Sequence, residues 1–201
     1  MPFLDPSKEI DRHRHKLPHW QQDRAWIFVT WRLVDSLPKP KLDEWNERRS
    51  IWLAHHPQPW DEATDMEFHE CFGEEVDGLL DAGHGSCLLR EIENARVVAN
   101  ALLYFDGQRY ELSNFVVMPN HVHVLFAPHP DHKLADIMHS WKRHTARMIN
   151  AREGKSGALW QRDYWDRLIR SQRHFDWVVG YIADNPKNLS DGDFLLWSAA
   201  L

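Results

Sequence analysis

Two histidines inside the apolar stretch "VVMPNHVHVLFAP" (116–128) have the spacing that most directly indicates chemistry. Alternate side chains of a strand share a face, so His121 and His123 point the same way, about 6.5–7 Å apart along the chain. Two imidazoles at this separation can bind one divalent cation when a third ligand comes from elsewhere. Two surface histidines on a half-exposed strand would give the same pattern, so the spacing needs support from another part of the chain.

A tyrosine near the end of the chain could supply a nucleophile. The helix predicted over residues 172–184 carries an apolar stripe of Phe175, Val178, Val179 and Ile182. Tyr181 lies roughly 110° from the centre of that stripe, so it is not a natural core position. Asn185 follows one turn later on the same side, directly before the proline that ends the helix. A half-buried packing tyrosine and an ordinary helix-terminal asparagine would also fit this pattern.

The elements that must position these residues mix strands with helices. A β-branched and aromatic run predicts a first strand, and two more strands joined by a short Pro-Asn turn predict an antiparallel pair. We expect strands at 26–35, 109–118 and 121–128, helices at 42–56, 61–82, 88–105, 134–149 and 172–184, and an extended segment at 157–170. This order indicates an α+β fold rather than alternating βαβ units.

Composition limits the classes of protein that the chain can belong to. A hydrophobic content of 43% over 201 residues suits one core, and 11 tryptophans argue for an ordered protein. Cys71 and Cys87 have neither disulfide nor metal-site spacing, which favours a reducing compartment. The chain has no apolar run of 18 residues and no signal-like start, so we expect a cytoplasmic protein without a membrane partner.

The charge distribution favours a nucleic-acid partner more than the net charge of −6 does. Residues 41–111 hold 6 basic against 16 acidic side chains, whereas residues 133–173 hold 10 basic against 4 acidic ones. The basic zone follows the two histidines directly, and the local field decides polyanion binding. Two solvated faces of opposite charge would account for the same numbers.

Several stretches together carry a resemblance to a known family. "MPNHVHVLF" resembles the His-hydrophobic-His motif of the single-tyrosine transposases of the HUH superfamily. The further stretches "HWQQDRAWIFVTWRLVDSLP", "GHGSCLLR", "SWKRHTARMIN", "LWQRDYWDRLIR" and "YIADNP" follow in order from about residue 18 to 190. They are most similar to the REP-associated tyrosine transposases, which act on repetitive palindromic elements.

This resemblance implies a fold and a domain organisation. It implies a ferredoxin-like central antiparallel sheet flanked by helices, with a helical insertion between the first strand and the histidine hairpin. We therefore expect a polar N-terminal arm at 1–24, one catalytic domain at 25–190 with an insertion at about 40–105, and a C-terminal tail at 191–201.

The resemblance also implies an activity. Tyr181 would attack single-stranded hairpin DNA at REP-like palindromes and form a covalent 5′-phosphotyrosine, making the protein a DNA-nicking and strand-joining enzyme. Asn185 would complete a metal site with His121 and His123, and such an N,N,O site suits Mg²⁺ or Mn²⁺. Relatives act as monomers or as homodimers, and a transposase of this kind would be bacterial and associated with the nucleoid.

Basic and aromatic residues in the zone after the histidines are candidates for contacts with DNA. Basic side chains can neutralise phosphates and aromatic rings can stack on unpaired bases. The candidates are Lys142, Arg143, Arg147, Arg162, Arg167, Arg170, Trp160 and Tyr164. Tyr164 in "QRDYWDR" is also the second possible nucleophile.

Two other functions remain open from the sequence. One is a catalytically weak hairpin-DNA-binding protein derived from a transposase, which would need neither the histidines nor Tyr181. The other is a metal-dependent hydrolase that activates water and does not use Tyr181. A covalent protein–DNA adduct would distinguish the transposase from both.

Overall fold

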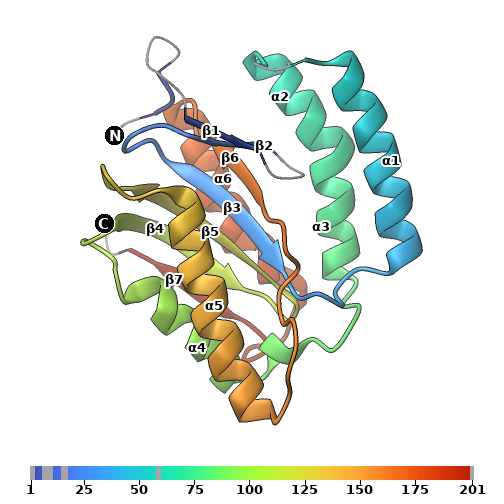
Figure 1. Ribbon diagram of the computed structural model, residues 1–201, viewed down its shortest axis with the longest axis vertical. Coiled ribbons are helices and arrows are strands. Elements are labelled where there is room, and N and C mark those ends of the chain that lie inside the picture. The colour runs from blue at the N-terminus through green and yellow to red at the C-terminus, as the bar shows by residue number, and fades with distance from the viewer. Residues whose placement is uncertain (1–2, 6–10, 15–17, 58–59, 200–201) are drawn as a thin grey trace. The chain divides into compact units, whose positions relative to one another are not determined.

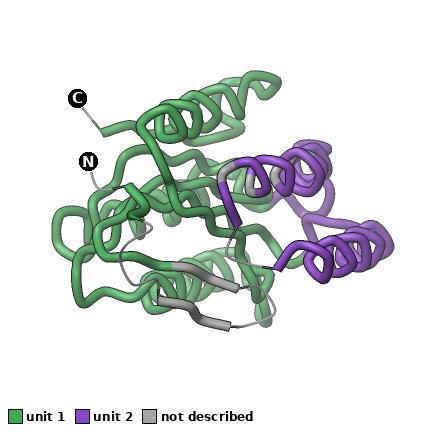
Figure 2. The backbone as a smooth tube through the Cα atoms, turned by 90° about the horizontal axis from the view of Figure 1, so that it is seen from above, with its two compact units in different colours: residues 1–34, 88–201 green, residues 35–87 purple. Residues whose placement is uncertain are grey.

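The computed structural model describes residues 3–5, 11–14, 18–57 and 60–199. The chain divides into two compact units (Figure 2). Unit 1 comprises residues 1–34 and 88–201, and unit 2 comprises residues 35–87.

A five-stranded antiparallel sheet forms the centre of unit 1. Its strands are β3 (Ile27–Arg32), β4 (Tyr110–Val117), β5 (His121–Pro128), β6 (Trp165–Leu168) and β7 (Leu195–Ser198). The spatial order is β6-β3-β5-β4-β7, so the first four strands have the ferredoxin-like arrangement and β7 extends it beside β4. The predicted α+β fold with a ferredoxin-like antiparallel sheet is confirmed.

Three helices cover the two faces of this sheet. They are α4 (Ile92–Leu103), α5 (Leu134–Glu153) and α6 (Gln172–Asp184), and short 3-10 helices occupy Leu88–Arg90 and Asn185–Asn188. Helices α4 and α5 lie on one face and α6 lies on the other (Figure 1). No helix among the described residues combines the length and apolarity needed to cross a bilayer.

Strand β5 is buried on both faces, which explains why its sequence is apolar almost throughout. Val122, Val124 and Phe126 pack in the cluster beneath α4 and α5. Leu125 and Ala127 belong to the second cluster, with Phe175, Val178 and Ile182 of α6. Because His121 and His123 share the alternation of Leu125, the histidines face α6.

The predicted helical stripes are found with small differences. Helix α5 buries Ile137, Met138 and Trp141 on one side, whereas Met148 is 42% exposed. Helix α5 ends at Gly154, which adopts the left-handed conformation. Helix α6 begins after Ser171, whose hydroxyl accepts a hydrogen bond from the backbone N–H of His174 at 3.2 Å.

The two ends of the chain contain more structure than the sequence predicts. In the arm predicted for residues 1–24, β1 (Asp11–Arg14) and β2 (Pro18–Gln21) form an antiparallel pair, and the rest lies largely outside the described residues. The tail predicted for residues 191–201 contains β7, where Trp197 stacks on Phe115 with ring centroids 5.2 Å apart. This aromatic pair explains why a short strand can form at the edge of the sheet.

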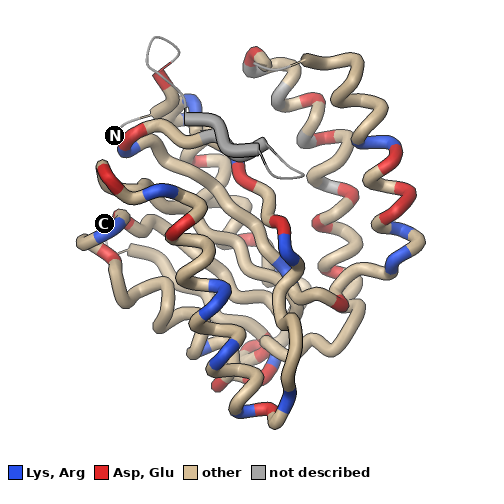
Figure 3. The backbone as a smooth tube through the Cα atoms, viewed as in Figure 1, with Lys and Arg blue, Asp and Glu red and all other residues tan. Residues whose placement is uncertain are grey.

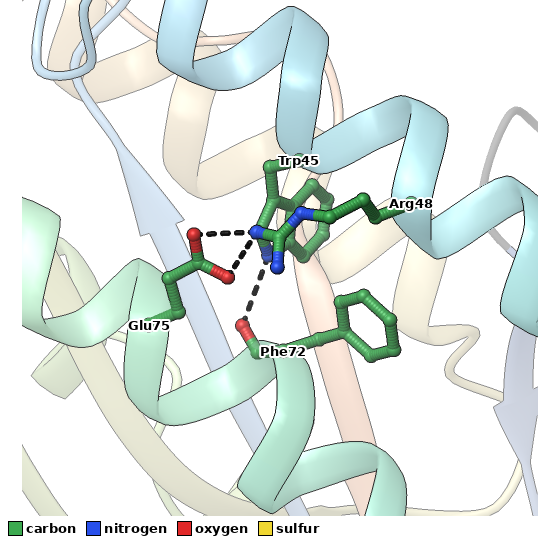
Figure 4. A network of polar contacts seen from close by, with 4 residues as sticks. All are labelled: Trp45, Arg48, Phe72 and Glu75. Atoms are coloured by element: carbon green, nitrogen blue, oxygen red, sulfur yellow. Dashed lines mark hydrogen bonds and ion pairs between the residues drawn. The ribbon is translucent and has the colours of Figure 1, made fainter.

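Unit 2 is a helical segment with its own aromatic core. Its helices are α1 (Lys39–His55), α2 (Glu62–Phe68) and α3 (Glu74–Asp81), with a π-helical turn at His69–Gly73 between the last two. The indole N–H of Trp45 donates to the carbonyl of Phe72 at 3.1 Å, and Arg48 pairs with Glu75 (Figure 4). Unit 2 ends at Cys87, and helix α4, which follows it, belongs to unit 1.

The ends of unit 2 meet at Gly85. The backbone N–H of Ser86 donates to the carboxylate of Asp35 at 2.8 Å. Gly85 has φ +86°, and a Cβ there would lie 2.4 Å from the carbonyl oxygen of Asp35. Gly83 also has a positive φ of +69°, but nothing lies within 4 Å of the position of its Cβ.

We expect Gly85→Ala to destabilise unit 2 more than Gly83→Ala does. Both substitutions place alanine in a left-handed conformation, which costs about 1 kcal/mol at Gly83, but only Gly85→Ala adds a clash with backbone, raising the cost to roughly 3 kcal/mol. Urea unfolding of the two variants measures the difference in free energy. Equal losses would contradict the close approach of Asp35.

Candidate functional site

The two histidines of β5 lie side by side beneath α6. His121 is 1% exposed and His123 is fully buried. Their ring centroids are 4.7 Å apart, with the ring planes at 80° to each other. The structure therefore brings the two imidazoles together on one face of the sheet, as the period of two predicts.

A hydrogen bond to Nδ1 holds each imidazole in place. The Nδ1 of His121 lies 2.7 Å from the side-chain oxygen of Asn120, in the turn before β5. The Nδ1 of His123 lies 2.7 Å from the hydroxyl of Thr30, the residue directly opposite on β3. Because an amide oxygen only accepts, Nδ1 of His121 carries the proton and Nε2 carries the lone pair. For His121, the nitrogen that can accept a ligand is thus Nε2.

Burial keeps His121 uncharged. Loss of hydration lowers the pKa of His121 from 6.5 to about 3, since the buried cation would lack the solvation that it has in water. A neutral imidazole is the form that binds metal ions. The site can therefore bind a cation at neutral pH without first losing a proton from this residue.

Tyr181 of α6 lies over the histidine pair and is half-buried. Its ring centroid is 5.3 Å from that of His123 and 5.8 Å from that of Phe28, edge to face in both cases. Trp177, one turn earlier and 45% exposed, stacks on Tyr181 with centroids 5.6 Å apart. Packing on three sides fixes the tyrosine ring beside the imidazoles.

Asn185 follows α6 at the start of the 3-10 turn. Its backbone N–H donates to the carbonyl of Tyr181, which ties the two residues together across one turn. The side-chain oxygen Oδ1 of Asn185 is buried and has no hydrogen-bond partner among the described residues. The Nε2 atom of His121 is also buried and has no hydrogen-bond partner among the described residues. Buried polar atoms without partners are costly, so each is a candidate metal ligand.

The donor set at this site fits a divalent cation. The described residues contain no group of three or more His, Cys, Asp or Glu side chains arranged to hold a metal. We expect a metal here to use the imidazole nitrogens of His121 and His123 with the amide oxygen of Asn185. Such an N,N,O set leaves coordination positions open and suits Mg²⁺ or Mn²⁺.

A buried arginine gives the same face a positive charge. Arg32 is 2% exposed and lies opposite His121 in the register of β3 and β5. Burial lowers the pKa of Arg32 to about 10, and the charge of Asp163 partly opposes this shift. Its guanidinium carbon lies 5.7 Å from the ring centroid of Trp165 on β6. With a pKa of about 10, Arg32 remains cationic at neutral pH.

The residues predicted to contact DNA fall into three groups. Arg143, Arg147 and Arg162 are exposed, and the basic residues of α5 are visible in Figure 3. Arg167 lies opposite Phe28 in the register of β3 and β6 and so belongs to the histidine face, while Arg170 is half-buried just before α6. Lys142, Trp160 and Tyr164 are engaged with the rest of the protein.

The engaged residues have structural partners. The ammonium of Lys142 donates to the carbonyls of Gln161 and Arg162, each at 2.7 Å. Trp160 is 6% exposed and its indole N–H donates to the hydroxyl of Thr145 at 2.9 Å. Tyr164 is 8% exposed within the main hydrophobic core. Tyr164 would have to leave the core before an unpaired base could stack on it, and only a small part of Trp160 reaches the surface.

Sequence reasoning missed the residues that orient the site. Thr30 and Asn120 hold the imidazoles, and Trp177 stacks on Tyr181. Asn120 adjoins the motif and could have been found as a polar side chain before a buried histidine. Thr30 could not, because its role depends on the pairing register of two strands 93 residues apart.

Residues 96–185 match the family model described as "Transposase IS200 like". The match begins in α4 and includes both histidines, Tyr181 and Asn185. This match covers a little under half of the chain and agrees with the family-level resemblance found in the sequence motifs.

Two solved structures are also similar. One, a REP-associated tyrosine transposase bound to a REP hairpin, is 17% identical and has a TM-score of 0.47, with 85% of this chain and 71% of that chain covered. The other is a Deinococcus radiodurans chain assigned as a transposase, 14% identical with a TM-score of 0.34, with 82% of this chain and 93% of that chain covered. None of the curated proteins matches.

The lowered pKa of His121 predicts a pH dependence of stability. In the unfolded chain the imidazole takes up a proton near pH 6.5, whereas in the folded chain it does so only near pH 3. The contribution to stability is therefore complete above pH 6.5 and is lost as the pH falls towards 3. Between pH 7.5 and 5.5 this residue alone should lower the free energy of unfolding by about 1.4 kcal/mol.

Urea unfolding with a chelator present, at pH 7.5 and 5.5, measures this change. His121→Gln should make the pH dependence shallower by that amount, and the same substitution at the exposed His144 serves as the control. An unchanged slope in His121→Gln would mean that the imidazole is protonated in the folded protein.

Proposed function

We propose that the protein cuts and rejoins single-stranded DNA at hairpin-forming palindromes of the REP type, with Tyr181 as the nucleophile and a divalent cation at the histidine pair. The observation that supports it best is the position of Tyr181. Its ring lies 5.3 Å from His123, on the same face of the sheet as both imidazoles and within the segment that matches the transposase family.

His121, His123 and Asn185 would hold the cation. When bound, Mg²⁺ or Mn²⁺ polarises a phosphate and stabilises the charge that develops on its oxygens. The orientation of both imidazoles and the neutral state of His121 would be set before the cation binds. Thr30 and Asn120 fix the two rings, and burial keeps His121 neutral. Arg32 adds a buried positive charge beside His121 that can orient the phosphate group.

Tyr181 would then carry the covalent chemistry. Its hydroxyl oxygen attacks the scissile phosphorus in line, an oxygen–phosphorus bond forms, and the bond to the 3′ oxygen breaks. The products are a 5′-phosphotyrosine and a free 3′-hydroxyl, to which the phenolic proton is transferred. A 3′-hydroxyl that attacks the phosphotyrosine reverses the step, so DNA is rejoined without an external energy source.

Tyr164 is the weaker candidate for the nucleophile. It lies in the core on the opposite face of the sheet from the histidines. Burial raises the pKa of Tyr164 above its usual value of 10, which disfavours the phenolate needed for attack. The position of Tyr164 and its raised pKa therefore both argue against it as the nucleophile.

An adduct assay tests the assignment. A labelled hairpin oligonucleotide with single-stranded flanks is incubated with the protein and Mn²⁺, and products are separated under denaturing conditions. We expect a protein–DNA adduct that disappears in Tyr181→Phe, because the attacking oxygen is absent, and persists in Tyr164→Phe, which removes the same group elsewhere. The opposite pattern would overturn the assignment.

The same assay tests the alternatives. Cleavage without an adduct in the unmodified protein would indicate attack by water and a metal-dependent hydrolase. Binding without cleavage or adduct would indicate a protein that recognises hairpin DNA without cutting it. Either result would reject the strand-transfer function.

The hydrogen bond between Thr30 and His123 predicts an effect on metal affinity. Thr30→Val keeps the size of the side chain but removes the partner of His123 Nδ1, so Mn²⁺ affinity should fall roughly 10- to 100-fold. Thr145→Val is the matched control, since Thr145 is equally buried but faces the other side of the sheet, where it accepts from Trp160. Calorimetric titration of both variants with Mn²⁺ measures the difference, and equal affinities would exclude a role for Thr30 at the metal site.

A further inference from the structure

A cleft lies outside the histidine site, between α5 and the segment 157–164. Its volume is about 360 Å³. Helix α5 covers the face of the sheet opposite α6, so this cleft and the tyrosine lie on different faces of unit 1 (Figure 1). Ligand pockets range over roughly 300–1,000 Å³, and a volume near the lower limit suits one small group rather than a duplex.

One wall of the cleft is apolar and rigid. Met138 and Ala146 of α5 face Leu159 and Trp160 of the segment. The segment is tied to the sheet because the backbone N–H of Val34 donates to the carbonyl of Leu159 at 2.9 Å. The hydrogen bond from Trp160 to Thr145 fixes the indole as well. Such a preformed apolar wall can receive the face of a planar ring without reorganisation.

The rim of the cleft carries basic side chains together with the carboxylate of Asp163. Arg143 reaches it from α5 and Arg162 from the segment, and both side chains are exposed. Lys142 lies between them and fastens the segment to α5 through the carbonyls of Gln161 and Arg162. Burial lowers the pKa of Lys142 to about 8, with Asp163 opposing the shift, so most of its charge is retained at pH 7. An apolar wall with a cationic rim matches a base attached to a phosphate.

We propose that this cleft binds a single unpaired nucleotide of the DNA strand, with the base against the apolar wall and its phosphate between Arg143 and Arg162. The identity of the ligand rests on the proposed function, since DNA is the substrate there. A base can enter such a cleft only when it is unpaired, so the site selects single-stranded DNA next to a hairpin over continuous duplex.

The segment that forms the cleft continues into the catalytic face. It leads directly into β6, whose Trp165 lies opposite Thr30 in the strand register and so faces α6. Strand β6 is the edge strand of the sheet and has β2 beside it, so a DNA strand that runs from the cleft to the histidines would have to pass around this edge. A nucleotide held in the cleft would thereby fix the distance along the DNA to the phosphate that Tyr181 attacks.

Abasic scanning of the DNA combined with filling of the cleft tests this proposal. Each unpaired position of the hairpin oligonucleotide is replaced in turn by an abasic site, and the Kd is measured with Tyr181→Phe protein in a chelator. One position should weaken binding roughly tenfold, as expected for loss of one stacked base. In the Ala158→Trp variant, where the indole occupies the cleft, the same abasic site should change the Kd less than twofold.

Control variants distinguish binding of a base in the cleft from general attraction of DNA to the positive charge of α5. Ala151→Trp adds the same ring to α5 outside the cleft, and Arg152→Ala removes an exposed charge from the same helix. Neither should alter the abasic profile, whereas Arg143→Ala should weaken binding of the intact oligonucleotide about tenfold. Ala135→Trp fills the cleft from the other wall and replaces Ala158→Trp if that variant does not fold.

A flat abasic profile, or a profile that Ala158→Trp leaves unchanged, would overturn the cleft assignment. The outcome is independent of the adduct assay. An adduct with a flat profile would leave the proposed function and reject the cleft. A cleft-dependent profile without an adduct would support nucleotide binding and reject strand transfer.

Discussion

The burial of two imidazoles in the central strand of the sheet is the constraint that the rest of unit 1 must satisfy. A buried histidine is costly unless both ring nitrogens are satisfied, and here two such rings lie 4.7 Å apart. Thr30 and Asn120 each satisfy one nitrogen, and both depend on backbone geometry: the β3–β5 register and the Pro-Asn turn. The sheet order that places β5 between β3 and β4 is therefore also the arrangement that orients the rings.

The two faces of the sheet differ in composition as a consequence. On the face covered by α4 and α5, side chains form a continuous apolar core that includes several aromatic rings. On the face covered by α6, the apolar cluster is smaller and gives way to the histidines, Thr30 and Arg32. The larger core stabilises the sheet, so the α6 face can hold buried polar groups that contribute little to stability by themselves.

The sequence predicts the elements of this fold well because each has a local periodic signal. The alternation in β5, the stripe of α6 and the proline after Asn185 each fix an element to within a residue or two. Local patterns of this kind do not predict an element whose formation depends on packing between segments that are distant in the sequence. Strand β7 is short and its sequence has no alternation of apolar and polar residues that would predict a strand. Its pairing with β4 is supported by the stacking of Trp197 on Phe115.

The same limit explains the residues of the basic zone. Their composition predicts positive charge and aromatic rings correctly, but it does not predict which groups the protein itself uses. Lys142 binds two carbonyls, and Trp160 binds Thr145, because α5 and the following segment pack together. No periodicity in the sequence reports that contact. Arg143 and Arg162 remain exposed, whereas Lys142 is used within the protein. A count of charges in the sequence cannot show this difference.

The packing of α6 against the sheet would allow both steps of the proposed strand transfer to occur at one site. Phe175, Val178 and Ile182 anchor α6 to the strand pair that carries the histidines, and Asn185 is joined to Tyr181 through the helix backbone. Tyrosine, imidazoles and amide are therefore supplied by one chain as parts of one packed unit. A 5′-phosphotyrosine formed there would stay beside the same imidazoles, so the cleaved end would remain in position for the reverse attack. Completing the proposed site does not require a helix from a second chain.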